Sequence, residues 1–170
     1  MIDENQRCCP KCGHPLIEKE LEHEGMVPYC EICKEYRFPF FSVAISAIVL
    51  SPDKKEILLI KQYHKDRYIL VAGYLNRGED SETALLREIK EEIGLEVESY
   101  HFNHSHYFKP SNTLMLNYTV VVKNKDIHPD FEIDSYHWFN IDEARKNIVR
   151  PSLASEFLDG YLTKEYHFSK

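Results

Sequence analysis

The chain has 170 residues, of which 43% are hydrophobic and 12% aromatic, so it can form a packed core and does not resemble a disordered segment. Its net charge of −7 argues against broad binding to nucleic acid phosphates, which requires a clustered basic face. The longest apolar run, residues 43–50, has the length of a strand, so no membrane span is expected. The N-terminal residues do not follow the pattern of a secretory signal, and a cytoplasmic location is the expectation.

Cysteine pairs near the N-terminus are the first strong pattern. Cys9 and Cys12 form one C-x-x-C pair and Cys30 and Cys33 a second, with 17 residues between the pairs. This spacing is typical of a zinc site, because each pair on a tight turn can direct two sulfurs at one ion. Cys8 is left over. The alternatives are a site in which His14 replaces one sulfur, reduced thiols that bind no metal, and disulfides.

The ion predicted at the four cysteines is structural Zn²⁺, because four thiolates leave no open coordination position for catalysis. A segment this short cannot form a sufficient core, and a bound metal would supply the missing stabilisation. We therefore predict a zinc ribbon at residues 1–36 and a larger domain at 37–170.

The larger domain is predicted to alternate strands with a few helices. Expected strands, rich in β-branched residues or bounded by turn residues, cover 43–50, 56–63, the start of 68–75, 96–108, 113–123 and 134–140. Helices are expected at 82–93, 142–147 and 151–162. Strands on both sides of a central helix indicate an α/β sandwich with a mixed sheet.

The helix at 82–93 carries an unusual charge cluster. Asp80 or Ser81 can cap its N-terminus, and Gly94 suits a left-handed C-terminal residue. Leu85, Ile89 and Ile93 form an apolar stripe, while the glutamates at 88, 91 and 92 are expected on another face. The repulsion within that cluster costs only a few tenths of a kcal/mol, so the charges alone would suit a solvated surface.

The residues around the cluster change this interpretation. Gly73, five residues, Glu79, seven residues and then the segment from Arg87 to Leu95 resemble the Nudix box, G-x5-E-x7-R-E-U-x-E-E-x-G-U, where U is aliphatic. Every fixed position of the box matches. The resemblance implies the Nudix fold, a mixed sheet between helices, in which the box forms a loop and a helix.

The resemblance also implies a metal site. In the family, glutamates of the box bind Mg²⁺ or Mn²⁺, hard ions that prefer oxygen ligands. In this sequence the implied ligands are Glu88, Glu91 and Glu92, with the backbone carbonyl of Gly73. Such ions neutralise a diphosphate and lower the pKa of the attacking water.

Supporting and basic groups are assigned in the same way. Arg87 would orient Glu91 through a helical pair, and Glu79 would have a structural role next to the metal ligands. Residues 131–144 resemble the family's E-I-x4-W-F segment, which places a further acid at Glu132. For the general base, Glu92, Glu132 and Glu88 are the candidates in that order.

A zinc ribbon directly before a Nudix domain resembles the NADH pyrophosphatases, although the larger N-terminal domain found in many of them is missing from this sequence. Residues 70–80 and 151–162 also resemble segments of that family. The aligned stretch SHYFKPSNTLM, residues 105–115, keeps the spacing of the family's S-Q-P-W-P-F-P-x-S-L-M motif but few of its identities. This departure leaves hydrolysis untouched and makes NADH selectivity the open question.

Several aromatic and basic residues are candidates for substrate contact. Tyr107 and Phe108, and Phe38 and Phe40 before the first long strand, could stack on a base, although packing is the commoner role of such rings. Lys61, His64, Lys65 and Arg67 could meet a phosphate or ribose, and solvent exposure is the simpler interpretation. A second metal site at His104 and His106 is a weaker alternative.

Three functions are compatible with these patterns. The first is a metal-dependent hydrolase of a nucleoside diphosphate linked to another group, with NAD(H) as the leading substrate. The second is a hydrolase of ADP-ribose, a dinucleoside polyphosphate or a capped RNA end. The third is a non-catalytic nucleotide sensor or adaptor, which would not need every carboxylate of the box. A homodimer is expected by analogy to the NADH pyrophosphatases.

Overall fold

The structure is a computed structural model that describes residues 6–164, and the chain divides into two compact units, residues 1–41 and 42–170. The sequence placed this boundary after residue 36. Residues 37–41 belong to the first unit because Arg37 contacts Cys9 and the Phe38 carbonyl accepts a hydrogen bond from Gln6. Among the described residues, no helix is long and apolar enough to cross a membrane.

The first unit is a three-stranded antiparallel sheet with little apolar interior. Its strands, in the order β1-β2-β3, are β1 (Ile17–Leu21), β2 (Gly25–Cys30) and β3 (Glu35–Tyr36). The buried cluster consists of Cys9, Leu16 and Cys30, with Cys33 packed against it. Because two of the three buried members are cysteines, the stability of this unit depends on what their sulfurs bind.

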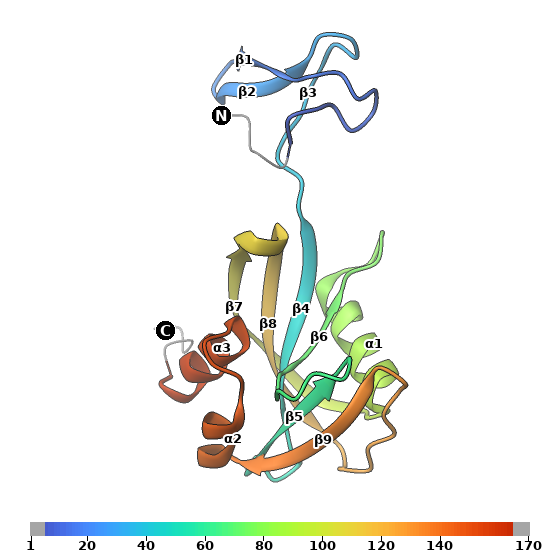
Figure 1. The fold of residues 1–170 in the computed structure, drawn as a ribbon, viewed down its shortest axis with the longest axis vertical. Helices are drawn as coiled ribbons and strands as arrows, with labels where there is room; N and C mark the ends of the chain where they lie inside the picture. The colour runs from blue at the N-terminus through green and yellow to red at the C-terminus, as the bar shows by residue number, and fades with distance from the viewer. Residues whose placement is uncertain (1–5, 165–170) are drawn as a thin grey trace. The chain divides into compact units, whose positions relative to one another are not determined.

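The second unit contains a six-stranded mixed sheet (Figure 1). Its strands are β4 (Ser42–Leu50), β5 (Glu56–Gln62), β6 (Val71–Tyr74), β7 (Val97–Phe108), β8 (Thr113–Val122) and β9 (Ile133–Asn140). The main order is β7-β8-β4-β5-β9, in which β4 and β8 are parallel and the other neighbours antiparallel. A short 3-10 helix, η1 (Lys109–Ser111), connects β7 to β8.

Strand β4 has two partners along one edge. Residues 44–47 pair with β6, whereas residues 49 and 50 pair with β5. The sheet therefore forks beside the first half of β4. Residues at this fork, from β4, β5 and β6, line a cavity that contains the acidic residues described below.

Helices cover both faces of the sheet (Figure 1). Helix α1 (Ser81–Ile93) packs on one face, where Leu85, Ile89 and Ile93 are fully buried. Helices α2 (Ile141–Asn147) and α3 (Leu153–Leu162) lie on the other face, where Phe157 and Leu158 are buried against the sheet. The predicted α/β sandwich with a mixed sheet is confirmed.

Most element boundaries agree with the sequence within two residues. The strand expected at the start of 68–75 begins only at Val71, and the last helix, which was predicted from residue 151, begins at Leu153. Its start is fixed by Ser152, whose side chain accepts a hydrogen bond from the Ser155 backbone, while the Ser155 hydroxyl accepts one from the Ser152 backbone. This reciprocal capping box leaves Pro151 outside the helix.

Candidate functional site

The Nudix-like segment forms the end of β6, a loop and helix α1. The helix begins at Ser81, one residue before the predicted start, because the Asp80 carboxylate caps it by accepting a hydrogen bond from the Thr83 N–H at 2.8 Å. It ends at Gly94, which has a φ of 71° in the left-handed region. These caps fix the helix at both ends and thereby set the positions of its glutamates.

The glutamates of α1 divide between two environments. Glu88 and Glu92 are only 8% and 6% exposed and lie on the side of the helix that faces the sheet. The Glu91 side chain is 59% exposed. The sequence grouped all three on one face, but positions i and i+4 differ by about 40° around a helix, whereas i+3 and i+4 differ by about 100°.

A cavity of about 470 Å³ collects the buried acids at the fork of the sheet. Its lining includes Glu88 and Glu92 from α1, Gly73 from β6 and Glu132 from the loop before β9. Gln62, Tyr63 and Met115 complete the walls with three further residues, namely Ala44, Ala72 and Tyr74. Glu91 is not part of this lining, so the structure places Glu88, Glu92 and Glu132 around one cavity and leaves Glu91 outside it.

Gly73 is required by the position of Glu88. A Cβ atom added at residue 73 would lie 2.0 Å from Cδ of Glu88 and 2.3 Å from its Oε1. The glycine therefore allows the carboxylate to lie directly against the β6 backbone, which also brings Glu88 close to the carbonyl implied as a metal ligand. No larger side chain could occupy this position without moving the carboxylate.

We predict that Gly73→Ala lowers activity about a hundredfold, because a displacement of about 1 Å in a reacting group can cost that much. The same substitution should also destabilise the protein. If the clash with Glu88 is the cause, Gly73→Ala should cost little further stability in a Glu88→Ala background, as measured by a double-mutant cycle of unfolding free energies. Equal costs in both backgrounds would contradict this explanation.

Glu92 is the most deeply buried acid of the cavity. Burial, together with the nearby charges of Glu88, Asp130 and Glu132, raises the pKa of Glu92 to about 8. The Gln62 amide donates a hydrogen bond to its Oε2 at 3.4 Å. A carboxylate with a pKa near neutrality can accept a proton from water and release it again, which suits a general base.

Glu132 is held by a residue that the sequence did not identify. The Tyr63 hydroxyl donates a hydrogen bond to Glu132 Oε2 at 2.5 Å, and this bond, with burial, raises the pKa of Tyr63 to about 12. The adjacent His64 pairs with Asp134, Nδ1 to Oδ1 at 2.9 Å. Tyr63 and Gln62 lie at the end of β5, far from the box in sequence, so no local pattern marked them.

Arg87 connects the acids of the box. Its guanidinium donates to both oxygens of Glu79, at 2.8 and 2.9 Å, and its Nη1 donates to Glu88 at 2.6 Å and to Glu91 at 3.0 Å. These bonds from Arg87, with one from the Asn76 N–H, lower the pKa of Glu79 to about 2. The sequence assigned Arg87 to Glu91 alone, whereas the structure shows a fork-to-fork pair with Glu79.

Arg87→Lys should therefore impair the site although it keeps the charge. A lysine can satisfy one carboxylate but not the planar pair with Glu79. We expect a loss of about 1–3 kcal/mol in unfolding free energy and about tenfold or more in activity. Arg77→Lys, in the exposed loop before the helix, is the matched control, and equal behaviour of the two variants in denaturation and rate assays would refute the assignment.

The candidate substrate aromatics lie outside the cavity lining. Tyr107 is 43% exposed near the end of β7, where its hydroxyl donates to Asn112 Oδ1 at 2.6 Å, and Phe108 is partly buried next to it. Phe38 and Phe40 are 57% and 51% exposed and belong to the first unit. Their roles in substrate binding remain predictions.

Four cysteine sulfurs converge in the first unit. The ligand atoms of Cys9, Cys12, Cys30 and Cys33 lie within 4.8 Å of one another, with Sγ–Sγ distances of 3.8 Å for Cys9–Cys33 and 3.5 Å for Cys12–Cys30. A tetrahedral zinc–thiolate site with bonds of about 2.3 Å requires sulfurs about 3.8 Å apart. The arrangement fits the ion.

Local hydrogen bonds reach two of these sulfurs and favour a thiolate at Cys9. The Arg37 Nε donates to Cys9 Sγ at 3.3 Å, and the Cys33 N–H donates to Cys30 Sγ at 3.4 Å. Burial works to raise the pKa of Cys9, but the bond from Arg37 and backbone bonds lower it to about 6. Within residues 6–164 these cysteines are the one group of three or more potential ligands this close together, and it includes neither Cys8 nor His14, His104 or His106.

Comparison with known proteins identifies the family. Residues 41–159 match the NUDIX domain model, and the chain therefore belongs to the Nudix family. Among similar curated proteins is one named NAD-capped RNA hydrolase NudC from Stutzerimonas stutzeri, 26% identical over 93% of this chain and 56% of that protein. A protein of the same name from Pseudomonas putida is 28% identical over 93% and 56%. The chain thus spans about half the length of the curated relatives it matches.

Solved structures support the fold. A NUDIX hydrolase from Nitrosomonas europaea superposes with a TM-score of 0.70 at 18% identity, covering 95% of this chain and 93% of that one. An Ap4A hydrolase from C. elegans superposes with a TM-score of 0.59 at 19% identity, covering 75% and 99%. At these identities the likeness establishes the fold and leaves the substrate to the chemistry of the site.

Proposed function

We propose that this protein is a metal-dependent hydrolase that cleaves the pyrophosphate bond of a nucleoside diphosphate linked to a second group, with NAD(H) as the leading substrate. The observation that carries the proposal is the cavity in which Glu88, Glu92 and Glu132 meet beside Gly73. Glu88 and Glu92 are buried and have raised pKa values, an arrangement that is unfavourable in an empty core and common where a site binds cations. Similarity to relatives that are named NAD-capped RNA hydrolases supports an NAD-type substrate.

The donor set suits Mg²⁺ or Mn²⁺. Glu88, Glu92, Glu132 and Gly73 line one cavity, and Glu91 is exposed outside this lining. The carboxylates line an open cavity and do not form a closed cluster, which fits ions that share their coordination with substrate phosphates and water. When bound, such ions neutralise the diphosphate and acidify a coordinated water.

The side chains of the protein then have separable roles. Arg87 and Glu79 hold Glu88 in place through the fork-to-fork pair. Glu92 is the first candidate to take the proton from the attacking water, and Glu132, held by Tyr63, is the second. Attack of that water oxygen on one phosphorus breaks the bridging P–O bond and yields two mononucleotides.

A capped RNA end is the second candidate substrate. The observation that favours it is the name of the relatives, since the cleaved bond in an NAD cap is the same pyrophosphate. The net charge of −7 does not favour a long RNA contact, so any RNA contribution should be limited to the cap and the first nucleotides.

The proposal is tested by a metal-dependent substrate panel. With Mn²⁺ or Mg²⁺, the protein should release two mononucleotides from NADH, detected by chromatography, and the ion alone should not. Parallel reactions contain ADP-ribose, a dinucleoside polyphosphate and an NAD-capped RNA, compared by kcat/KM. A higher kcat/KM for the capped RNA would replace the first substrate by the second, and no release from any of them would favour a nucleotide sensor.

The oligomeric state is a separate proposal. A homodimer is expected only by analogy with the NADH pyrophosphatases, and light scattering would measure it directly. A monomeric mass at the concentration of the activity assay would exclude a dimer.

A further inference from the structure

A second cavity lies in the second unit, away from the acidic cavity. It has a volume of about 270 Å³ and shares no lining residue with the acidic cavity. It reaches β4 at Leu50 and β8 at Thr119 and Val121, whereas the acidic cavity reaches these parallel strands at Ala44 and Met115. Leu50 lies six positions along the strand from Ala44, which corresponds to about 20 Å.

The floor of this cavity exposes part of a buried polar network. Thr119 donates a hydrogen bond to Asn103 Oδ1 at 3.0 Å, and Asn103 Nδ2 donates to Asn117 Oδ1 at 2.8 Å. Asn117 in turn donates to the carbonyl and hydroxyl oxygens of Ser46. Asn103, Asn117 and Ser46 are no more than 3% exposed. Burial of so many polar groups within one sheet face is costly unless hydrogen bonds compensate.

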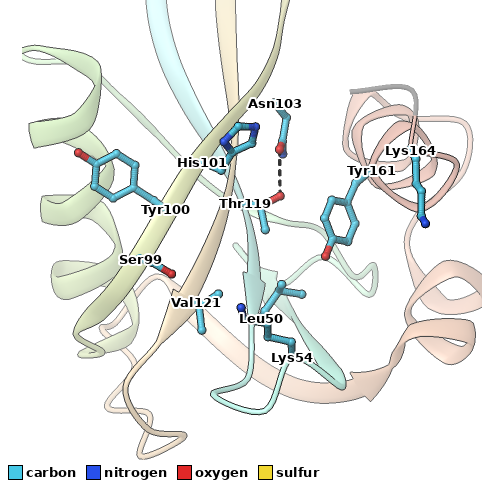
Figure 2. Close-up of a pocket in the computed structure, with 10 residues that line it drawn as sticks. All are labelled: Leu50, Lys54, Ser99, Tyr100, His101, Asn103, Thr119, Val121, Tyr161 and Lys164. Carbon is cyan, nitrogen blue, oxygen red and sulfur yellow. Dashed lines mark hydrogen bonds between the residues drawn. The ribbon is translucent and has the colours of Figure 1, made fainter. Parts of the chain in front are cut away.

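Asn103 enters this network because of an irregularity in β7. The pairing of β7 with β8 shifts register between Phe102 and His104, so Asn103 is the extra residue of a β-bulge. Bulges commonly redirect a side chain, and here the Asn103 amide meets Thr119 on the cavity floor, as Figure 2 shows. The Asn103 amide has a second N–H beyond the one given to Asn117, and the Thr119 oxygen can still accept a bond.

The walls of the cavity are aromatic and basic. The Tyr161 ring extends from α3 over the apolar floor of Leu50 and Val121 (Figure 2). Tyr100 of β7 also lines the cavity, but its ring points to the other face of the sheet, where it packs edge-on against Tyr118 (Figure 2). Lys54, from the turn between β4 and β5, and Lys164, after α3, also line the cavity, and Figure 2 shows them on opposite sides of Tyr161.

The lining of this cavity is positively charged, whereas the chain as a whole is negatively charged. The residues that line the cavity include no Asp or Glu, although the chain as a whole carries −7. Within residues 6–164, no carboxylate forms an ion pair with Lys54 or Lys164. Two lysines that lack an internal counterion beside an uncharged aromatic cavity favour a ligand with an anionic group on a flat body.

We propose that this cavity binds a nucleoside monophosphate at a site separate from the acidic cavity. The base edge would pair with the second N–H of Asn103 and the oxygen of Thr119, which together offer the donor and the acceptor that a nucleobase edge requires. The ring would stack on Tyr161, and the phosphate would lie toward one of the two lysines, Lys54 or Lys164. A volume of about 270 Å³ suits one mononucleotide better than a dinucleotide. This site does not depend on the proposed hydrolysis.

The test is a titration of the full chain with AMP, followed by ¹H–¹⁵N NMR in buffer to which neither Mg²⁺ nor Mn²⁺ is added. Backbone signals of residues 99–103 and 119–121 should shift, and adenosine or inorganic phosphate should bind more weakly than AMP. Lys54→Ala combined with Lys164→Ala should weaken binding about tenfold, and Thr119→Val about fivefold. Lys90→Ala combined with Lys146→Ala, exposed lysines elsewhere on the unit, is the charge-matched control.

Each outcome decides the proposal. Glu92→Gln, which removes a charge from the acidic cavity, should bind AMP at the second cavity as the unchanged protein does, so failure of the hydrolase proposal would leave this one intact. Shifts confined to Gly73 and Glu92 would place AMP in the acidic cavity and overturn the inference. Equal affinity of the paired lysine variants, or a short RNA that binds more than tenfold tighter than AMP, would also overturn it.

Discussion

Glu92→Gln is expected to lower the rate of metal-dependent pyrophosphate hydrolysis by about 10²–10⁴-fold while the fold is kept. Glutamine has nearly the same shape but can neither accept the proton of an attacking water nor supply a negative charge to an ion. Glu92 lies in the cavity with Glu88 and Glu132, only 6% exposed. The rate of mononucleotide release from NADH at saturating Mn²⁺ measures this loss directly.

The same variant should stabilise the protein when no divalent ion is added. The folded-state pKa of Glu92 is raised to about 8 from 4.5, so the folded state binds the proton more tightly than the unfolded state. The cost of burying this group is therefore absent below about pH 4.5, grows as the pH rises and is complete above about pH 8. At pH 8.5 we expect the unfolding free energy of Glu92→Gln to exceed that of the unchanged protein by about 2–4 kcal/mol. At pH 4 the two proteins should have equal unfolding free energies.

The control is Glu98→Gln, the same chemical change at an exposed position of β7. It should alter neither rate nor stability by a measurable amount. A Glu92→Gln variant that keeps full activity, or that is less stable than the unchanged protein at pH 8.5, would show that Glu92 is not a buried charge of the site. Added Mg²⁺ should stabilise the unchanged protein more than the variant, because the ion would offset the charge cost.

The local features of the site could be predicted from sequence because they depend on short-range rules. The ends of α1 follow from Asp80 and Gly94, and the strands from their β-branched residues. The requirement for glycine at position 73 also follows from the box, although its cause, the Glu88 carboxylate lying against the backbone, is visible only in the structure.

The remaining parts of the site arise from tertiary contacts that sequence spacing does not encode. Tyr63 reaches Glu132 across 69 positions of the chain, and Gln62 reaches Glu92 across 30. The pairing of Arg87 with Glu79 joins residues eight positions apart, one in the loop before α1 and one within the helix, so the helical i, i+4 rule found only the Glu91 contact. The second cavity was missed for the same reason, because its bulge, helix and turn residues have no common motif.

The second large effect concerns the cysteines. Cys12→Ala should abolish zinc binding and unfold the first unit, because a structural zinc site contributes about 10–16 kcal/mol to such small domains and needs all four ligands. The buried cluster of this unit is Cys9, Leu16 and Cys30, too little apolar surface to hold three short strands without an ion. The zinc content of the purified protein and the NMR signals of residues 6–41 would measure the effect.

Cys8 provides the internal control for this prediction. It is exposed and lies outside the sulfur cluster, so Cys8→Ala should retain one zinc per chain and all signals of the first unit. Loss of zinc from Cys8→Ala would show that the ligand set is wrong, and a folded Cys12→Ala unit without metal would show that the ion is dispensable. Arg37→Ala should fall between these limits, because it removes the hydrogen bond to Cys9 Sγ, raises the thiol pKa and thereby weakens zinc binding most at low pH.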